Sequence, residues 1–111
     1  MRLQSVENAA YIEAMRKRGG DTDTIRRVML TLSFLTIEDR NAFLKEVSKL
    51  GFTPGGTSWD GESTHPACCT VSGFTSLSLQ KLNRFTARAI SAAAPMEGML
   101  TDIEAEVVKR Y

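Results

Sequence analysis

The residues with the most reactive side chains lie close together in the middle of the chain. His65 is the only histidine, it precedes Pro66, and the adjacent pair Cys68 and Cys69 follows. Imidazole and thiolate groups are common zinc ligands, but a tetrahedral site needs several of them around one ion. Neighbouring residues of a strand project to opposite faces, so these thiols are not expected to share an ion. Adjacent cysteines also rarely form a disulfide. We therefore expect two reduced thiols and no metal site.

The other polar residues do not form a catalytic pattern. A nucleophile needs a base and a group that orients the base, and the chain has one imidazole for that task. Asp102, Glu104 and Glu106 alternate along a predicted strand, where a solvated outer face explains them without the burial that acid–base catalysis needs. The glycine pairs at 19–20 and 55–56 match no phosphate-binding fingerprint. The sequence thus predicts no enzyme and no cofactor.

Composition indicates an ordinary globular protein. The chain has 111 residues, of which 42% are apolar and 24% charged, and its net charge is +1. We expect one domain over residues 1–111, with an N-terminal helix and its glycine stop in 1–20 and the core in 21–111. Residues 1–20 lack the apolar run of a signal peptide, and no segment approaches the roughly 18 apolar residues of a membrane span. Together with the unpaired thiols, this predicts a cytoplasmic protein that does not enter a membrane.

Direct nucleic-acid binding is not expected. The net charge is almost neutral, and basic residues cluster only locally, at 16–18 and 26–27. A sheet that binds single-stranded RNA stacks bases on aromatic residues of its central strands. Here the outer face of the first strand offers Met29 and Leu35, and Phe74 is the only aromatic residue of the second central strand.

Hydrophobic periodicity predicts the elements of the first half. Residues 6–15 look helical, and residues 28–35 alternate with the period of a strand that is buried on one face. The expected buried set of this strand is Val28, Leu30, Leu32 and Phe34. Thr36 is typical of a helix N-cap and precedes a helix predicted over 37–50. The apolar stripe of that helix is expected to hold Phe43, Val47 and Leu50.

The second half repeats the alternation of strands and a helix. Gly51 ends the preceding helix, and the proline and glycines in 52–59 indicate an edge strand with a bulge or loop. Residues 67–74 read as a strand, and Ser76 or Ser78 is expected to cap the next helix. The buried side of that helix is expected to contain Leu82, Phe85, Ala89 and Ala93.

The last predicted strand, 99–108, alternates with Met99, Ile103 and Ala105 on one face and Leu100 on the other. After the first helix, the order is strand, helix, strand, strand, helix, strand. This order predicts an α+β fold, a ferredoxin-like βαββαβ sandwich with an extra N-terminal helix. Right-handed crossovers place the strands of Leu32 and Val71 in the centre.

Four segments of the sequence resemble the regulator of ribonuclease activity B family. They are GGDTDTIRRVMLTLSF, the LGF at 50–52, the strand with the cysteine pair, and EGMLTDIEAEVV. The resemblance implies a ferredoxin-like fold without catalytic residues, and a protein partner, an endoribonuclease of the ribonuclease E type, that the protein inhibits. The chain departs from familiar members in being nearly neutral and in ending with Lys109, Arg110 and Tyr111. It also has methionines at 96 and 99 where the family usually has the aromatics of Tyr-Asp-Gly-Trp.

The resulting functional hypothesis is a regulatory protein that binds another protein. Asp21, Asp23, Trp59 and Asp102 are the predicted contact residues, because they are polar or aromatic groups in loops or on the outer face. For Trp59 we weigh this against packing over the sheet edge, and favour the packing. Two alternatives remain: a small-molecule-binding domain of the amino-acid-sensor kind, and a homodimer formed through the sheet face around Met29 and Leu35.

Overall fold

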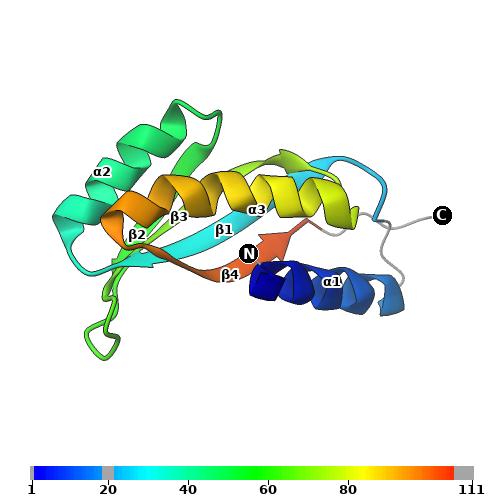
Figure 1. Ribbon diagram of the computed structural model, residues 1–111, viewed down its shortest axis with the longest axis horizontal. Helices are drawn as coiled ribbons and strands as arrows, with labels where there is room; N and C mark the ends of the chain where they lie inside the picture. Colours follow the sequence, from blue (N-terminus) through cyan, green and yellow to red (C-terminus); the bar gives the residue numbers. More distant parts are fainter. Residues whose placement is uncertain (1, 19–21, 107–111) are drawn as a thin grey trace.

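A computed structural model describes residues 2–18 and 22–106 of the protein (Figure 1). The elements in chain order are α1 (Arg2–Lys17), β1 (Arg26–Phe34), α2 (Ile37–Ser48), β2 (Thr53–Trp59), β3 (Ala67–Thr75), α3 (Leu79–Ala93), the short 3₁₀ helix η1 (Ala94–Met96) and β4 (Met99–Ala105). Within this part of the chain, no helix is both long and apolar enough to cross a bilayer.

The four strands form one antiparallel sheet in the order β2-β3-β1-β4. This confirms the predicted α+β, ferredoxin-like arrangement with an additional N-terminal helix, and it confirms β1 and β3 as the central strands. In Figure 1 the helices α2 and α3 lie across one side of the sheet, and α1 runs beside α3 near β4. The opposite side of the sheet has no helix over it among the described residues.

Apolar residues at every second position of β1 form the sheet side of the hydrophobic core. The four apolar residues predicted to face inward, Val28, Leu30, Leu32 and Phe34, are all fully buried. Their neighbours across the sheet in β3 are inward-facing as well, for example Cys69 opposite Leu32 and Val71 opposite Leu30. Because opposite residues of an antiparallel pair point to the same face, this register joins the two central strands into one apolar surface.

Capping determines where α2 begins and ends. The hydroxyl of Thr36 accepts a hydrogen bond from the backbone N–H of Asp39, 3.1 Å away, as predicted for an N-cap. Gly51, with a φ of 90°, turns the chain after the helix, and Phe52 then enters the core. The predicted helix over 37–50 is too long, because α2 ends at Ser48. Leu50 therefore leaves the expected stripe and is 41% exposed.

The second core helix, α3, places four predicted residues inside. Leu82, Phe85, Ala89 and Ala93 are all buried. Ser78 occupies the N-cap position, but its side chain makes no capping hydrogen bond. Below the helix, Gly73 lets β3 approach closely, because a β-carbon there would lie 2.7 Å from Cε1 of Phe85.

The two edge strands differ from each other. In β2 the register against β3 shifts between Pro54 and Thr57, and every residue of β2 is exposed, as predicted for an interrupted edge strand. The β4 edge is partly covered by α1, where the hydroxyl of Tyr11 accepts a hydrogen bond from the backbone N–H of Ala105 at 2.9 Å.

The predicted alternation of β4 is wrong at its start. Thr31 pairs with Asp102, but the next residue of β1, Leu32, pairs with Leu100, so Thr101 is an extra residue in a bulge. The bulge shifts the period by one, and Leu100 packs against the core together with Ile103 while Met99 is exposed. The Thr101 hydroxyl stabilises the bulge by donating to the carbonyl of Thr31 at 3.2 Å.

Polar contacts connect α1 to α3. The amide nitrogen of Asn8, a fully buried residue, donates to Asn83 at 2.8 Å and to the hydroxyl of Thr86 at 3.1 Å. A buried amide without partners would cost roughly 1–3 kcal/mol, so this network fixes the helix in one position. The helix includes the predicted segment 6–15 and is longer at both ends.

Candidate protein-binding site

The side of the sheet without helices is the candidate site, and we call it the open face. The paired positions show which residues share it, since Met29 lies opposite both Ser72 and Glu104, and Thr31 lies opposite both Thr70 and Asp102. Its residues in the three strands are Arg27, Met29, Thr31, Ser33, Cys68, Thr70, Ser72, Phe74, Met99, Asp102 and Glu104. The chain thus forms a broad surface of mixed chemistry.

Apolar side chains are exposed at one end of this face. Arg27 pairs with Phe74, whose ring is 74% exposed, and Ile25 directly before β1 is 66% exposed. Beside them is a hollow of about 330 Å³, lined by Arg27, Met29, Glu104 and Glu106 among others. A large, solvated aromatic ring gains considerably from being covered, so this end of the open face is suited to contact a partner.

Carboxylates border the same end. Asp102 and Glu104 point from β4 toward the open face, and Glu106 follows directly, with its backbone N–H donating to the carbonyl of Arg27 at 3.1 Å. All three carboxylates are on exposed residues. Alternate residues of a strand lie roughly 7 Å apart, so the acids form a row along one edge. Such a row favours a basic partner surface.

The cysteines lie on the two faces, as predicted. Cys69 is buried in the core, and burial raises the pKa of its thiol to about 11, more than the nearby Arg40 guanidinium lowers it. Cys68 is half-buried on the open face, with its sulfur 3.5 Å from the hydroxyl of Ser33. A thiol with such a high pKa is not a nucleophile at neutral pH. Cys69 therefore acts as a small apolar core residue.

His65 lies in the β2–β3 connection. Its Nδ1 is 3.2 Å from the hydroxyl of Thr64, and its backbone N–H donates to the hydroxyl of Ser63. Within residues 2–18 and 22–106, no three His, Cys, Asp or Glu side chains lie close enough together to hold a metal ion.

Of the four predicted contact residues, the three that the structure describes do not lie together in one site. Asp21 lies outside the described residues. Asp23 is exposed before the start of β1, whereas Trp59 pairs with Ala67, which lies opposite Phe34 at the other end of β1. A strand of this length spans roughly 26 Å, so Asp23 and Trp59 are at opposite ends of the sheet.

Trp59 and Asp102 also differ in their positions. Trp59 is 59% exposed on the edge strand β2, so our interpretation that it packs over the sheet edge was wrong. Asp102 lies on the open face in the acidic row. The residues that the sequence reasoning missed are Ile25, Phe74 and Glu104. Phe74 has the opposite parity to the buried Val71, and this is the signal in the sequence that would have placed it on the outer face.

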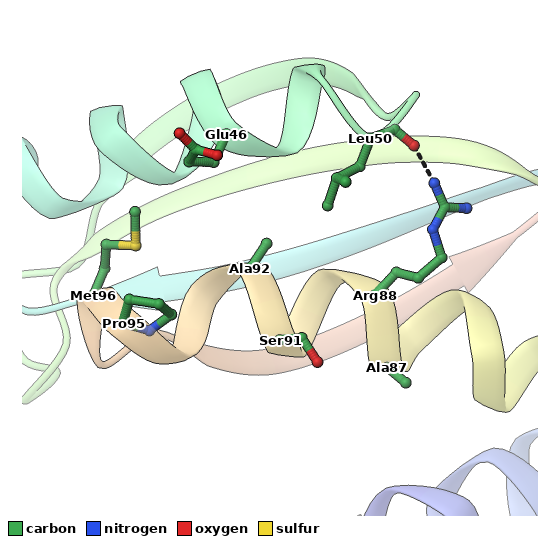
Figure 2. A pocket seen from close by; sticks show the side chains of 8 residues that line it. All are labelled: Glu46, Leu50, Ala87, Arg88, Ser91, Ala92, Pro95 and Met96. Atoms are coloured by element: carbon green, nitrogen blue, oxygen red, sulfur yellow. Dashed lines mark hydrogen bonds between the residues drawn. The ribbon is translucent and has the colours of Figure 1, made fainter.

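A second concave surface lies between helices on the other side of the molecule. A groove of about 690 Å³ lies between the end of α2 and the outer side of α3, and Figure 2 shows the side chains that line it. Leu50 and Ala92 point into it, Pro95 and Met96 close one end, and the Arg88 guanidinium closes the other by donating to the carbonyl of Leu50. We call this the α2–α3 groove.

The fold defines a small α+β protein with an open sheet face on one side and a groove between helices on the other. Comparison with protein families gives the more particular assignment. The family model for regulator of ribonuclease activity B matches residues 5–102, nearly the whole described fold, and the chain belongs to this family. Membership implies a regulatory role toward ribonuclease activity and a protein partner. Comparison with individual curated proteins gave no significant match.

Proposed function

We propose that the protein binds an endoribonuclease of the ribonuclease E type and lowers its activity, and that the open face of the sheet makes the contact. Family membership supports the regulatory role. The observation that supports this particular surface is the exposed Phe74, which lies across β1 from the acidic row, with Arg27 and Met29 between them. Regulation of this kind takes place in the cytoplasm.

The chemistry of the open face suggests how such binding would work. Phe74 provides an apolar contact at one end of the face, and hot spots of this type carry much of the binding free energy of an interface. Glu104 and Asp102 would pair with Arg or Lys side chains of the ribonuclease, which speeds association at low salt. The ribonuclease would lose activity because the bound regulator obstructs or repositions its RNA-binding surface.

Binding and inhibition can be measured with purified components. The ribonuclease E-type enzyme of the same organism is immobilised, the affinity of the protein is determined, and cleavage of a labelled model RNA is followed with and without it. Phe74→Asp is expected to weaken binding by about thirtyfold, the effect of losing one hot spot of roughly 2 kcal/mol. Val6→Asp is the matched control, since Val6 is similarly exposed, at 67%, but lies on α1.

Two different results would contradict the proposal at different levels. If the wild-type protein neither binds the ribonuclease nor slows cleavage, the proposed function is wrong. If it binds, and Phe74→Asp binds as tightly as Val6→Asp, the function holds and the proposed surface is wrong. Light scattering on the same samples tests the alternative of a homodimer, in which Phe74→Asp would convert a dimer to a monomer.

A further inference from the structure

The α2–α3 groove has the features of a second docking site. Its wall from α3 and η1 includes Arg88, Ala92 and Met96, which are spaced four residues apart and follow one another along the same side. Eight residues of helix span about 12 Å, which corresponds to two turns of a helix lying alongside. Leu50 forms the facing apolar wall and is 41% exposed without a cover among the described residues.

The shape of the groove suits a peptide more than a metabolite. Small-molecule sites bury most of their ligand's surface, whereas the α2–α3 groove is open along the outer side of two helices (Figure 2). Amphipathic helices bind in grooves of this type through apolar residues one turn apart.

The charged residues around the groove indicate which charge a bound peptide would carry. Helix α3 carries Lys81, Arg84 and Arg88 on exposed positions and has no acidic residue from Leu79 to Ala93. The acid on the groove wall, Glu46, already forms an ion pair with Lys49 at 3.3 Å. The α3 side of the groove, from Lys81 to Arg88, is therefore positive and complementary to an acidic segment, while Glu97 after η1 adds an acid at the opposite end.

Arg88 is held in a position to bind a carboxylate. Its Nη2 donates to the carbonyl of Leu50, and its Cζ lies 5.2 Å from the centroid of the Phe52 ring. A guanidinium has five N–H donors, and within the described part of the chain one hydrogen bond from this group is formed. A guanidinium that is fixed by stacking and one hydrogen bond loses little further conformational entropy when it binds a carboxylate through a bidentate interaction.

We propose that the α2–α3 groove binds an acidic amphipathic helix of a partner protein, with two apolar side chains against Ala92, Leu50 and Met96, and a carboxylate, one turn further along, on Arg88. This site is on the opposite side of the sheet from the open face. The proposal is therefore independent of the proposed function, and each can fail without the other.

The test uses the full chain and a displayed library of helix-forming synthetic peptides that is randomised along one face. Peptides are selected on the wild-type protein and counter-selected on Ala92→Arg, which fills the groove. We expect the enriched peptides to share two apolar residues one turn apart and an Asp or Glu one turn beyond. Failure to recover any peptide whose binding depends on Ala92, or recovery of peptides without the acid, would overturn the proposal.

Fluorescence anisotropy with one selected peptide then locates the carboxylate. Arg88→Gln is expected to weaken binding by about tenfold or more, the effect of losing a hydrogen bond to a charged group. Arg84→Gln, on the same helix but outside the groove lining, should change affinity less than about twofold. Equal losses would mean diffuse attraction by the basic helix and would overturn the assignment of Arg88.

Because Arg88 also contacts Leu50 and Phe52, its replacement can disturb the fold. A substitution in the peptide avoids this difficulty. Replacing its acid, Glu→Gln, should weaken binding to the wild-type protein about as much as Arg88→Gln does. That same change should have almost no effect on binding to Arg88→Gln. If the two losses simply add, the carboxylate does not bind Arg88 and the proposal is refuted.

Discussion

Alkaline pH is expected to destabilise the fold through Cys69 by an amount that follows from its burial. Desolvation raises the pKa of this thiol from 9.0 to about 11, while Arg40 lowers it and Cys68 raises it to smaller extents. In the unfolded chain the thiol ionises near its ordinary value. Between these two pKa values the unfolded state binds fewer protons than the folded state, so stability is complete below pH 9 and falls as pH rises.

The magnitude at pH 10 can be worked out directly. There the unfolded thiol is about one unit above its pKa and the folded thiol about one unit below, which amounts to about 1.4 kcal/mol of stability lost relative to neutral pH. Well above pH 11 the loss levels off at about 2.7 kcal/mol.

Urea denaturation at pH 8 and pH 10, in a reducing buffer, measures this loss. Cys69→Ala lowers stability at both pH values because a small cavity forms, but it removes the titrating group. The free energy of unfolding of the wild type should therefore drop between the two pH values by about 1.4 kcal/mol more than that of Cys69→Ala. Cys68→Ala keeps the buried thiol and should show nearly the same drop as the wild type, because Cys68 raises the pKa of Cys69 only to a small extent. A drop of equal size in the wild type and in Cys69→Ala would refute the reasoning.

Three further changes test the fold and the cysteines. Thr36→Ala removes the N-cap hydrogen bond of α2 and should cost about 0.5–2 kcal/mol in urea denaturation, and no loss would mean the cap is unimportant. Gly98→Ala puts a methyl group 2.8 Å from Cζ of Phe34, so it should cost roughly 1–3 kcal/mol, and an unchanged melting temperature would contradict this packing. Iodoacetamide should label Cys68 in the native protein and Cys69 only in urea, as checked by peptide mass spectrometry; equal labelling of both in the native state would show that Cys69 is accessible.

The sequence predicted those elements whose signals are local. The alternation from Val28 to Phe34 describes a strand with one buried face, and it needs no knowledge of its neighbours. Thr36 likewise caps its helix with a hydrogen bond to a residue three positions away. In both cases the residues that favour the strand or the helix start lie within a few positions of one another in the chain, and the structure agrees with the prediction.

The errors arose where a distant strand or helix decides the outcome. The bulge at Thr101 depends on pairing with β1, 70 positions earlier in the chain, and it reverses the face of Leu100. Trp59 appeared large enough to require burial, but it lies on an edge strand whose residues are all exposed. Periodicity along the chain contains neither kind of information.

The candidate site was predictable only in part for the same reason. The prediction that Asp102 lies on the outer face is correct, because Asp102 follows the bulge in the chain and the predicted alternation of faces holds from there to the end of β4. The grouping of Phe74 with Arg27 and the acids of β4 follows from the register of three strands that are far apart in sequence. The α2–α3 groove depends on how α2 ends, and the predicted end of that helix was two residues too late.

The way in which the two sheet edges are protected limits how partners can bind. Many proteins recognise an extended peptide by letting it join a sheet as an additional strand, which requires a row of free outward N–H and C=O groups. Here proline and a register shift interrupt one border, and the phenol of Tyr11 occupies an outward N–H of the other. A partner that enters at β4 would have to displace α1 and its buried Asn8. Association through broad surfaces therefore needs no local unfolding, and the regulator can remain rigid while it binds.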